Sequence, residues 1–341
     1  MAYTTINKST DYFNTKLHTG NGAEQAITGV GFQPDWTWIK KRNNTAVHYL
    51  FDAVRGATYF LNSDQTYTNQ DNAQSLKSFD SDGFTLGTMA GANNSSDTFV
   101  SWNWKANGAG SANTDGSINT TATSVNTTAG FSISKYTGTG SNATVGHGLG
   151  VAPSIVLCKN LSASGNWIMY HSTQGATKYM VLNATDAVAT ATSAWNDTAP
   201  TSSVFSVGTG STVNGSGNNL IAYCFAEKTG FSKFGSYTGN ANANGPFIYT
   251  GFKPAFVLHK RTDSTSDWDL FDNKRVGYNV DNRILAPNTN AAEVTATKID
   301  LLSNGFKLRT STGGNYSGTY IYMAFAEAPL VGSNNVPATA R

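Results

Sequence analysis

Short apolar segments that alternate with polar positions run along the whole chain. Trp36 and Trp38 flank a threonine in one such segment, and the apolar residues of segment 100–104 alternate with a serine and an asparagine. Every second side chain of a β-strand points to the same face, so this period of two predicts strands with one face in a core. Turn formers such as Asp82-Gly83 and Asn304-Gly305 lie between these segments. The pattern predicts many short antiparallel strands and little helix.

The pattern is repeated three times. Segment 31–40 begins with Gly-apolar-X-Pro and ends with a lysine, and segments 150–159 and 251–260 do the same. The proline of each segment is followed after 70, 72 and 71 residues by the closing aromatic residues Trp104, Phe225 and Phe325. Self-similarity at a nearly constant period indicates a repeated structural unit.

The repeats predict the organisation of the chain. We expect an all-β protein of three tandem antiparallel β-sandwich or jelly-roll units, with the aromatic residues in the three cores. The expected segments are an N-terminal arm (1–10), unit 1 (11–106), a polar linker (107–128), unit 2 (129–228), unit 3 (229–330) and a C-terminal tail (331–341). The linker is assigned because this tract contains no aromatic residue and is rich in Ala, Asn, Gly, Ser and Thr.

Composition supports strands and narrows the choice of partners. Thr, Asn, Gly and Ser make up about two fifths of the 341 residues, and these residues favour strands and turns over helices. An aromatic content of 12% argues against disorder. Only 13% of the residues are charged, the formal net charge is +2, and no basic run is longer than Lys40-Lys41-Arg42. We therefore expect no nucleic-acid partner, and the lack of a long apolar run predicts no membrane span.

No catalytic motif occurs in the sequence. The chain contains neither H-E-x-x-H, nor a G-x-x-x-x-G-K-[ST] phosphate loop, nor a G-x-S-x-G elbow. No pair of acids recurs across the units in the way that glycoside hydrolysis would require. The sequence predicts a protein that is not an enzyme, and a glycan depolymerase is the least favoured alternative.

Acidic residues gather in two places. They are Asp263, Asp267, Asp269 and Asp272 in unit 3, and Asp80 with Asp82 in unit 1. Carboxylates on loops are ligands that suit Ca²⁺, so Ca²⁺ is an alternative to the expectation of no metal and no cofactor. Unit 2 argues against a general site, because His171 stands where the others have Asp52 and Asp272. Arg55 and Arg275 follow these two acids at the same offset, which favours local ion pairs.

Three residues are retained as candidate binding residues. Asp267 and Asp269 belong to the acidic group of unit 3. Trp195 has no counterpart in the other units, so we expect it to be exposed and able to stack on a sugar ring. The two cysteines, Cys158 and Cys224, both fall on expected strands of unit 2. A bridge between them is geometrically possible, but free thiols are favoured.

Several segments also carry a resemblance to a known family. They are the opening 2–16, the anchor 31–35, the segments 51–56 and 80–84, and the ending 323–327. These resemble a family of repeat-containing structural proteins from virions of marine tailed bacteriophages, usually described as tail-fibre-like, whose units are similar to concanavalin A-like sandwiches. The family offers no catalytic residues to transfer. Unit 2 departs from its pattern by lacking the Phe-Asp and Arg positions.

The resemblance implies a non-enzymatic structural protein on the virion exterior, as a tail fibre or knob or as a head decoration, assembled in the host cytoplasm. Implied partners are other capsid or tail proteins, docked through the N-terminal region or the C-terminal tail. Rotational symmetry of phage positions favours a homo-oligomer such as a trimer, although three units of one chain could also form a pseudo-threefold ring. The alternative function is a receptor-binding, lectin-like protein that recognises host surface glycans.

Overall fold

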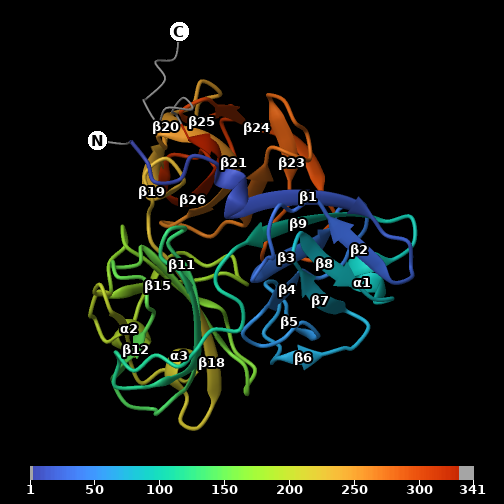
Figure 1. Cartoon of the computed structure of the whole chain (residues 1–341). Helices are drawn as coiled ribbons and strands as arrows, with labels where there is room; N and C mark the ends of the chain where they lie inside the picture. The colour runs from blue at the N-terminus through green and yellow to red at the C-terminus, as the bar shows by residue number, and fades with distance from the viewer. Residues whose placement is uncertain (1–2, 330–341) are drawn as a thin grey trace.

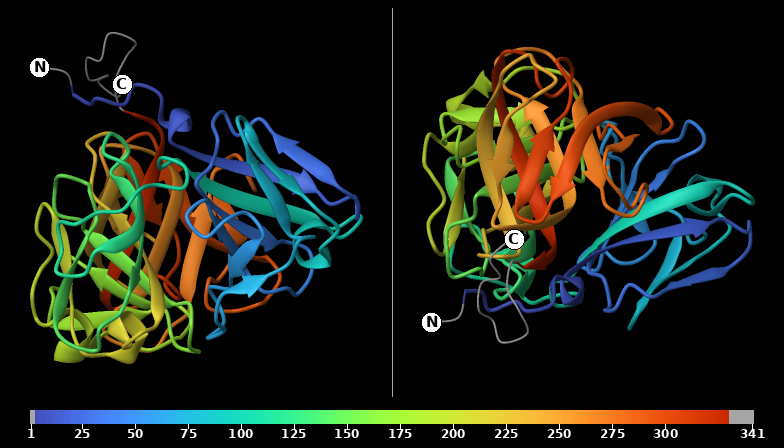
Figure 2. Two further views of the ribbon diagram at one scale, coloured as in Figure 1. Left: turned by 60° about the horizontal axis from the view of Figure 1, so that its bottom comes forward. Right: turned by 90° about the horizontal axis from the view of Figure 1, so that it is seen from above.

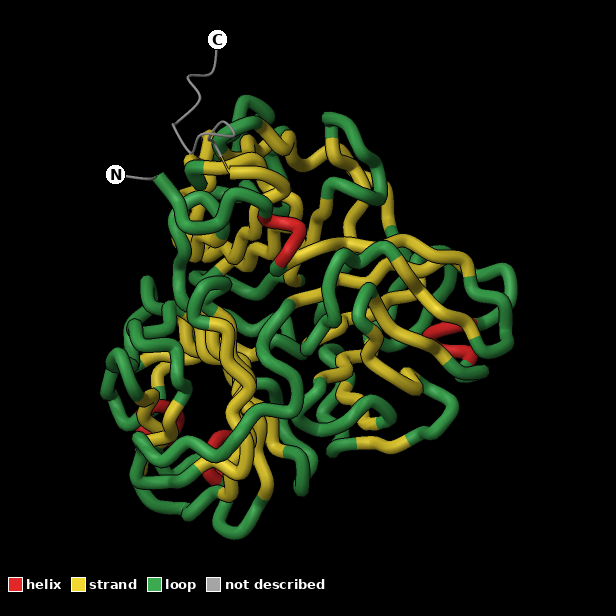
Figure 3. The backbone as a smooth tube through the Cα atoms, in the orientation of Figure 1, coloured by secondary structure: helices red, strands yellow, loops and turns green. Residues whose placement is uncertain are grey.

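The computed structural model describes residues 3–329, and nearly all of its regular structure is antiparallel β-sheet. Figure 3 shows strands throughout, with short helical segments among them. Within the described residues the three α-helices have four residues each, and none is long and apolar enough to cross a membrane. The predicted all-β class is confirmed.

Unit 1 is a sandwich of two sheets. Its elements are η1 (Ser9–Asp11), β1 (Phe13–Thr19), β2 (Gln25–Thr28), β3 (Trp36–Lys41), β4 (Tyr49–Asp52), β5 (Tyr59–Leu61), β6 (Gln70–Asp71), β7 (Leu76–Asp80), β8 (Gly83–Leu86), α1 (Ala90–Asn93) and β9 (Thr98–Trp104). The larger sheet has the order β1-β9-β3-β4-β5-β6, and the smaller has the order β2-β8-β7. Ile39, Phe51 and Phe84 belong to the apolar core between them.

Unit 2 repeats this plan with an additional edge strand. Its elements are β10 (Thr120–Asn126), β11 (Phe131–Thr137), β12 (Ala143–Gly146), β13 (Ile155–Asn160), β14 (Ile168–His171), β15 (Lys178–Val181), β16 (Ala189–Thr190), α2 (Thr192–Trp195), β17 (Val204–Val207), α3 (Ser211–Asn214) and β18 (Asn219–Phe225). The larger sheet has the order β10-β11-β18-β13-β14-β15-β16, and β12 pairs with β17.

Unit 3 consists of two four-stranded sheets. Its elements are β19 (Ser232–Gly239), β20 (Phe247–Tyr249), β21 (Phe252–Arg261), β22 (Trp268–Asp272), β23 (Asp281–Ile284), β24 (Val294–Leu302), β25 (Gly305–Leu308) and β26 (Gly318–Pro329). The sheet orders are β19-β26-β21-β22 and β20-β25-β24-β23.

The predicted linker 107–128 is wrong in its extent. Residues 120–126 form β10, which pairs antiparallel with β11 from Thr120↔Tyr136 to Asn126↔Phe131. Threonine and valine in this tract suit a strand, and their pairing covers an edge of β11 that would otherwise be open. The sequence did not predict β10 because its residues are mostly polar, and the apolar residues of this strand pair lie mainly on β11.

The three units form a closed ring. Figures 1 and 2 show three lobes that meet at the centre of the molecule. The same backbone contact occurs at each junction: Ala46 donates its N–H to Asn290, Gly165 to Thr66, and Ser266 to Thr185, each over 2.9 Å. These contacts join unit 1 to 3, unit 2 to 1, and unit 3 to 2. The chain is thus a pseudo-threefold ring of its own three repeats.

The sheets that contain β3, β13 and β21 are buried on both faces along these strands. Trp36, Ile155 and Phe256 occupy equivalent positions, opposite Asp52, His171 and Asp272 in their sheets. All three apolar residues belong to one core cluster that draws on every unit. The ring of Trp36 lies 4.7 Å from that of Tyr223 in unit 2.

This shared core corrects one expectation. The sequence placed these aromatic residues inside individual sandwiches, whereas they lie between the units. All six residues of β3 are buried, because Ile39 faces the sandwich core of unit 1 and Trp38 faces the centre.

The N-terminal segment is packed rather than extended away from the units. Ile6 is 1% exposed and belongs to the central core. Tyr3 donates its hydroxyl to the carbonyl of Gly251 in unit 3 over 3.0 Å. The predicted tail, 331–341, lies outside the described residues.

Candidate functional site

Two of the three predicted binding residues line one surface pocket. Asp267 and Asp269 lie at the start of β22, beside a pocket of about 280 Å³ in unit 3. The other lining residues are Ile284, Ala286, Thr289, Ala291, Ala292, Val294 and Lys298. The pocket therefore combines an apolar wall with two carboxylates and one ammonium group.

The two carboxylates differ in their surroundings. Asp269 is buried, with Lys298 Nζ 2.8 Å and His259 Nε2 3.4 Å from its Oδ2. Burial opposes ionisation of Asp269, but contact with His259 and Lys298 outweighs it and lowers the pKa of Asp269 to about 2. Asp267 is exposed and accepts a hydrogen bond from Asn288 over 2.7 Å. Asp269 is fixed by the protein, while Asp267 faces solvent.

A pocket also lies at the equivalent place in unit 2. It has about 180 Å³ and is lined by Asn166, Ile168, Tyr179, Ala191, Ser193, Ala194, Gly210 and Thr212. Asn166 and Ile168 flank Trp167 as Asp267 and Asp269 flank Trp268. In unit 1 the corresponding Tyr49 packs edge-on against Phe60, with ring centroids 5.2 Å apart. Units 2 and 3 therefore share this pocket, but only the pocket of unit 3 is lined by charged side chains.

Trp195, the third predicted residue, is not exposed. It ends α2 and is 2% exposed. Its ring packs edge-on against Tyr170 in the core of unit 2, with centroids 6.0 Å apart. The expectation of an exposed ring available for sugar stacking is therefore wrong. The residue lacks a counterpart because α2 itself has none in the described parts of units 1 and 3.

The acidic side chains that suggested Ca²⁺ have partners within the protein. Asp80 accepts hydrogen bonds from Ser78 and Thr85. Asp82 accepts from two backbone N–H groups, and Asp263 pairs with Arg261 over 2.7 Å. Among the described residues, no group of three or more His, Cys, Asp or Glu side chains is arranged to hold a metal ion.

Both cysteines are free and fully buried, in agreement with the favoured prediction. Burial raises the pKa of the Cys158 thiol to about 12. A thiol with such a pKa is not a nucleophile near neutral pH, because the thiolate is the reactive form.

The predicted Asp–Arg pairs are confirmed, and each has a further partner across a unit boundary. Asp272 binds Arg275 Nε over 2.6 Å and accepts from Trp102 Nε1 of unit 1 over 3.0 Å. Asp52 binds Arg55 and accepts from the hydroxyl of Tyr223 in unit 2 over 2.7 Å.

At the third junction the pairing is different. His171 takes the place of the acid, and its Nε2 lies 3.4 Å from the carbonyl oxygen of Tyr322 in unit 3. The positions that correspond to Arg275 and Trp102 are Gln174 and Met323. The junction between units 2 and 3 therefore lacks the acid, and it also lacks the two side chains that donate to the acid at the other junctions.

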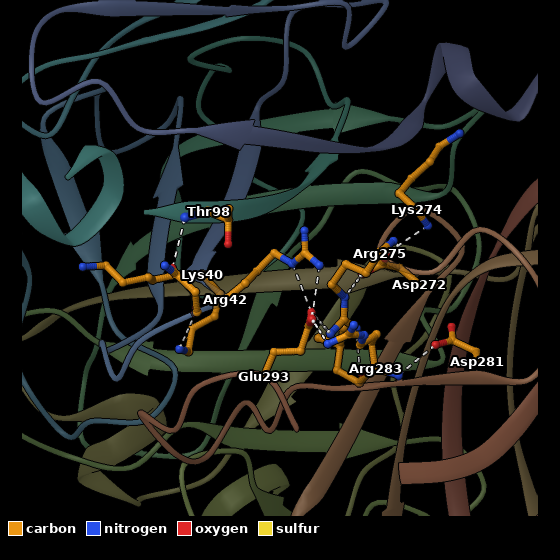
Figure 4. Close-up of polar contacts among 12 residues, drawn as sticks. Lys40, Arg42, Thr98, Asp272, Lys274, Arg275, Asp281, Arg283 and Glu293 are labelled. Atoms are coloured by element: carbon orange, nitrogen blue, oxygen red, sulfur yellow. Dashed lines mark hydrogen bonds and ion pairs between the residues drawn. The ribbon is translucent and has the colours of Figure 1, made fainter. Parts of the chain in front are cut away.

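A larger ionic cluster joins unit 3 to unit 1, as Figure 4 shows. Arg42 donates from Nε and Nη2 to the two oxygens of Glu293, over 3.1 Å each. Arg275 Nη1 binds the same carboxylate over 3.1 Å, and Arg283 Nη1 lies 3.4 Å away. The Glu293 side chain is only 5% exposed. Sequence analysis missed this residue, since its partners lie in distant segments.

The lysine that ends each repeated motif is buried at a junction. Lys159 donates to the carbonyl of Thr66 in unit 1 over 2.9 Å, and Lys260 to that of Thr185 in unit 2 over 3.2 Å. Lys40 donates to the carbonyl of Lys41 over 2.8 Å. Burial lowers the pKa of each of these three lysines to about 8.

We expect these lysines to make the protein more stable in mild alkali. The unfolded lysine binds a proton up to a pKa of about 10.4, whereas the folded lysines release theirs near pH 8. The unfolded state then holds more protons in this window, so the free energy of unfolding rises with pH. Each lysine is expected to contribute about 2 kcal/mol between about pH 7.5 and 9.5. Urea denaturation at both pH values measures this rise.

Lys159 is the best residue for this test because burial is the sole cause of its shift. In the variant Lys159→Met, the rise in the free energy of unfolding between the two pH values should be smaller by about 2 kcal/mol, the contribution of Lys159. Lys77→Met, whose side chain is 37% exposed, should retain the full rise. An identical rise in wild type and Lys159→Met would contradict the assignment.

A family model described as a domain of unknown function (DUF7483) matches residues 8–329. No curated protein matches the chain. The matched range spans all three units together.

Proposed function

The chain belongs to the DUF7483 family, a domain of unknown function, and we propose that it is a non-enzymatic structural protein on the exterior of a tailed phage virion, as the resemblance of its sequence implies. It serves there as a tail fibre or knob, or as a head decoration. Its partners in this proposal are capsid or tail proteins and further copies of the chain.

The observation that carries the proposal is the closed ring. Contacts at the three junctions repeat one another, and β3, β13 and β21 are buried on both faces of their sheets. The space at the centre is about 10 Å³, which is room for one water molecule. A body built in this way holds its shape without a moving part, as an exposed virion component requires. Its pseudo-threefold form also suits the rotational symmetry of phage assemblies.

The chemistry of the interior supports a structural role. The acids at the junctions neutralise arginines, and the buried thiols are protonated at neutral pH. The ion pairs lie in packed interfaces between units and the thiols lie in the core of unit 2, rather than in an open cleft.

The proposal is tested on purified virions. An antibody against the chain should decorate a fixed position on head or tail in negative-stain images, and the chain should co-purify with virions at constant stoichiometry. Detection only in the soluble lysate of infected cells would refute it. Sedimentation of the isolated protein measures whether the ring is a monomer or assembles further.

Receptor binding is the second candidate, and the repeated pocket of units 2 and 3 favours it. Both hollows carry polar side chains beside apolar ones, which is the mixture that small-molecule sites use. Wild-type protein should bind host envelope polysaccharide in a titration, and Asp267→Asn should weaken this binding. Asp263→Asn is the matched control, because Asp263 lies outside the pocket. A flat wild-type titration would contradict this candidate.

A further inference from the structure

Unit 3 carries a longer loop beside its buried Asp–Arg pair. Leu285, the residue that pairs with Leu270, lies 13 positions after Asp272. The corresponding residues lie nine positions apart, as Asp52 and Leu61 in unit 1 and as His171 and Met180 in unit 2. The additional length lies in the segment that leads to β23, so this segment is specific to unit 3.

The longer loop lies beside a small pocket of about 70 Å³. Its lining residues are Lys253, Asn273, Gly277, Tyr278, Asn279, Asp281 and Leu301. The amide of Asn279 holds the loop against β24, because it donates to the carbonyl and accepts from the N–H of Leu301, over 2.8 Å each. The loop beside the pocket is therefore held in place by hydrogen bonds between a side chain and the backbone.

Two acceptor oxygens in this pocket lack a partner. Asp281 Oδ2 and Asn273 Oδ1 are buried and have no hydrogen bond from any described residue. Asp281 is 2% exposed, and its other oxygen accepts from the N–H of Arg283 over 3.2 Å. An unpaired buried carboxylate oxygen is costly, and such groups normally bind a partner of opposite charge.

The nearby cationic side chains are already engaged. Arg275 binds Asp272 and Glu293, and Lys253 pairs with Glu327 over 2.7 Å. Among the described residues none forms an ion pair with Asp281, so its Oδ2 faces the pocket without a cation of its own.

We propose that this pocket binds a divalent cation, with Ca²⁺ as the best match, through Asp281 Oδ2 and Asn273 Oδ1. Carboxylate and amide oxygens are ligands that Ca²⁺ prefers, and water molecules complete its coordination. The volume of about 70 Å³ admits an ion with water.

The bound ion would fasten the junction between units 3 and 1. Asn273 directly follows Asp272, which accepts from Trp102 of unit 1. Asp281 begins β23 in the second sheet of unit 3. A cation that joins Asn273 to Asp281 therefore ties this junction to the rest of the unit. This inference goes beyond the proposed function and does not depend on it.

Calorimetric titration of the full chain with CaCl₂ tests the site. With few protein ligands, the expected dissociation constant is about 10⁻⁴ to 10⁻³ M. Terbium should bind the same site, and excitation of Tyr278, which lines the pocket, should sensitise its emission. Ca²⁺ should displace terbium and should raise the melting temperature of the protein.

Two variants and one control make the test specific. Asp281→Asn keeps the shape of the side chain and should weaken Ca²⁺ binding at least tenfold, while Asn273→Asp should strengthen it. Asp267→Asn, in the other pocket of unit 3, should bind like wild type. A flat wild-type titration up to about 10 mM Ca²⁺ would overturn the proposal, as would equal binding by folded Asp281→Asn.

Discussion

Replacing Asp272 with alanine is expected to lower the free energy of unfolding by about 3–5 kcal/mol, the usual cost of breaking a buried ion pair. The carboxylate is fully buried and accepts from Arg275 and from Trp102 of unit 1. It also accepts from the N–H groups of Lys274 and Arg275, over 3.0 Å each. Its loss leaves the Arg275 charge buried with Glu293 as its remaining close carboxylate. Urea denaturation at pH 7 measures the effect.

Two further variants show whether the lost stability comes from contacts at the junction. Asp52→Ala, which breaks the equivalent pair in unit 1, should cost a similar amount. Asp263→Ala removes a surface pair whose carboxylate is 40% exposed and should cost at most about 1 kcal/mol. A loss for Asp272→Ala as small as that for Asp263→Ala would show that the buried pair does not hold the ring.

Placing an aspartate at position 171 is expected to destabilise the protein by a similar amount, although it makes unit 2 resemble its neighbours. The position is 1% exposed. Gln174 stands where the other units have an arginine, and the side chain of Met323 has no N–H or O–H to donate. The new carboxylate would therefore be buried without a cation, which typically costs about 3–5 kcal/mol.

Adding the missing arginine should reverse most of this loss. In the double variant His171→Asp/Gln174→Arg, the guanidinium can reach the carboxylate as Arg55 reaches Asp52. The free energy of unfolding should return to within about 2 kcal/mol of wild type, the remaining deficit reflecting the absent donor at Met323. Double-variant stability no better than that of His171→Asp would contradict the equivalence of the three junctions.

The repeats and strands were readable in the sequence because they depend on local rules. A strand turns each second side chain to the same face, so the period-two pattern located β3 and its relatives. The Asp52–Arg55 and Asp272–Arg275 pairs were also predictable, because three residues across a tight turn bring the side chains together. These predictions needed no knowledge of how the units meet.

The candidate site was only partly predictable. Asp267 and Asp269 were identified by their charge, but the pocket beside them also needs Lys298 and the segment around Ala291. The prediction that Trp195 is exposed was wrong because the sequence alone does not show which side of α2 packs against the core. Asp281 stood out in no motif, since its significance comes from a buried oxygen without a partner among the described residues.

The sequence by itself determined that the chain contains three related all-β units, where most of their strands lie, and which acids pair with local arginines. Only the tertiary structure decided that the units close into a ring, that Trp36 and its equivalents pack between units, and that β10 lies within the predicted linker. The physical reason is that an apolar strand face is compatible with burial against its own second sheet or against a neighbouring unit. Its partner is chosen by long-range packing, which local patterns do not contain.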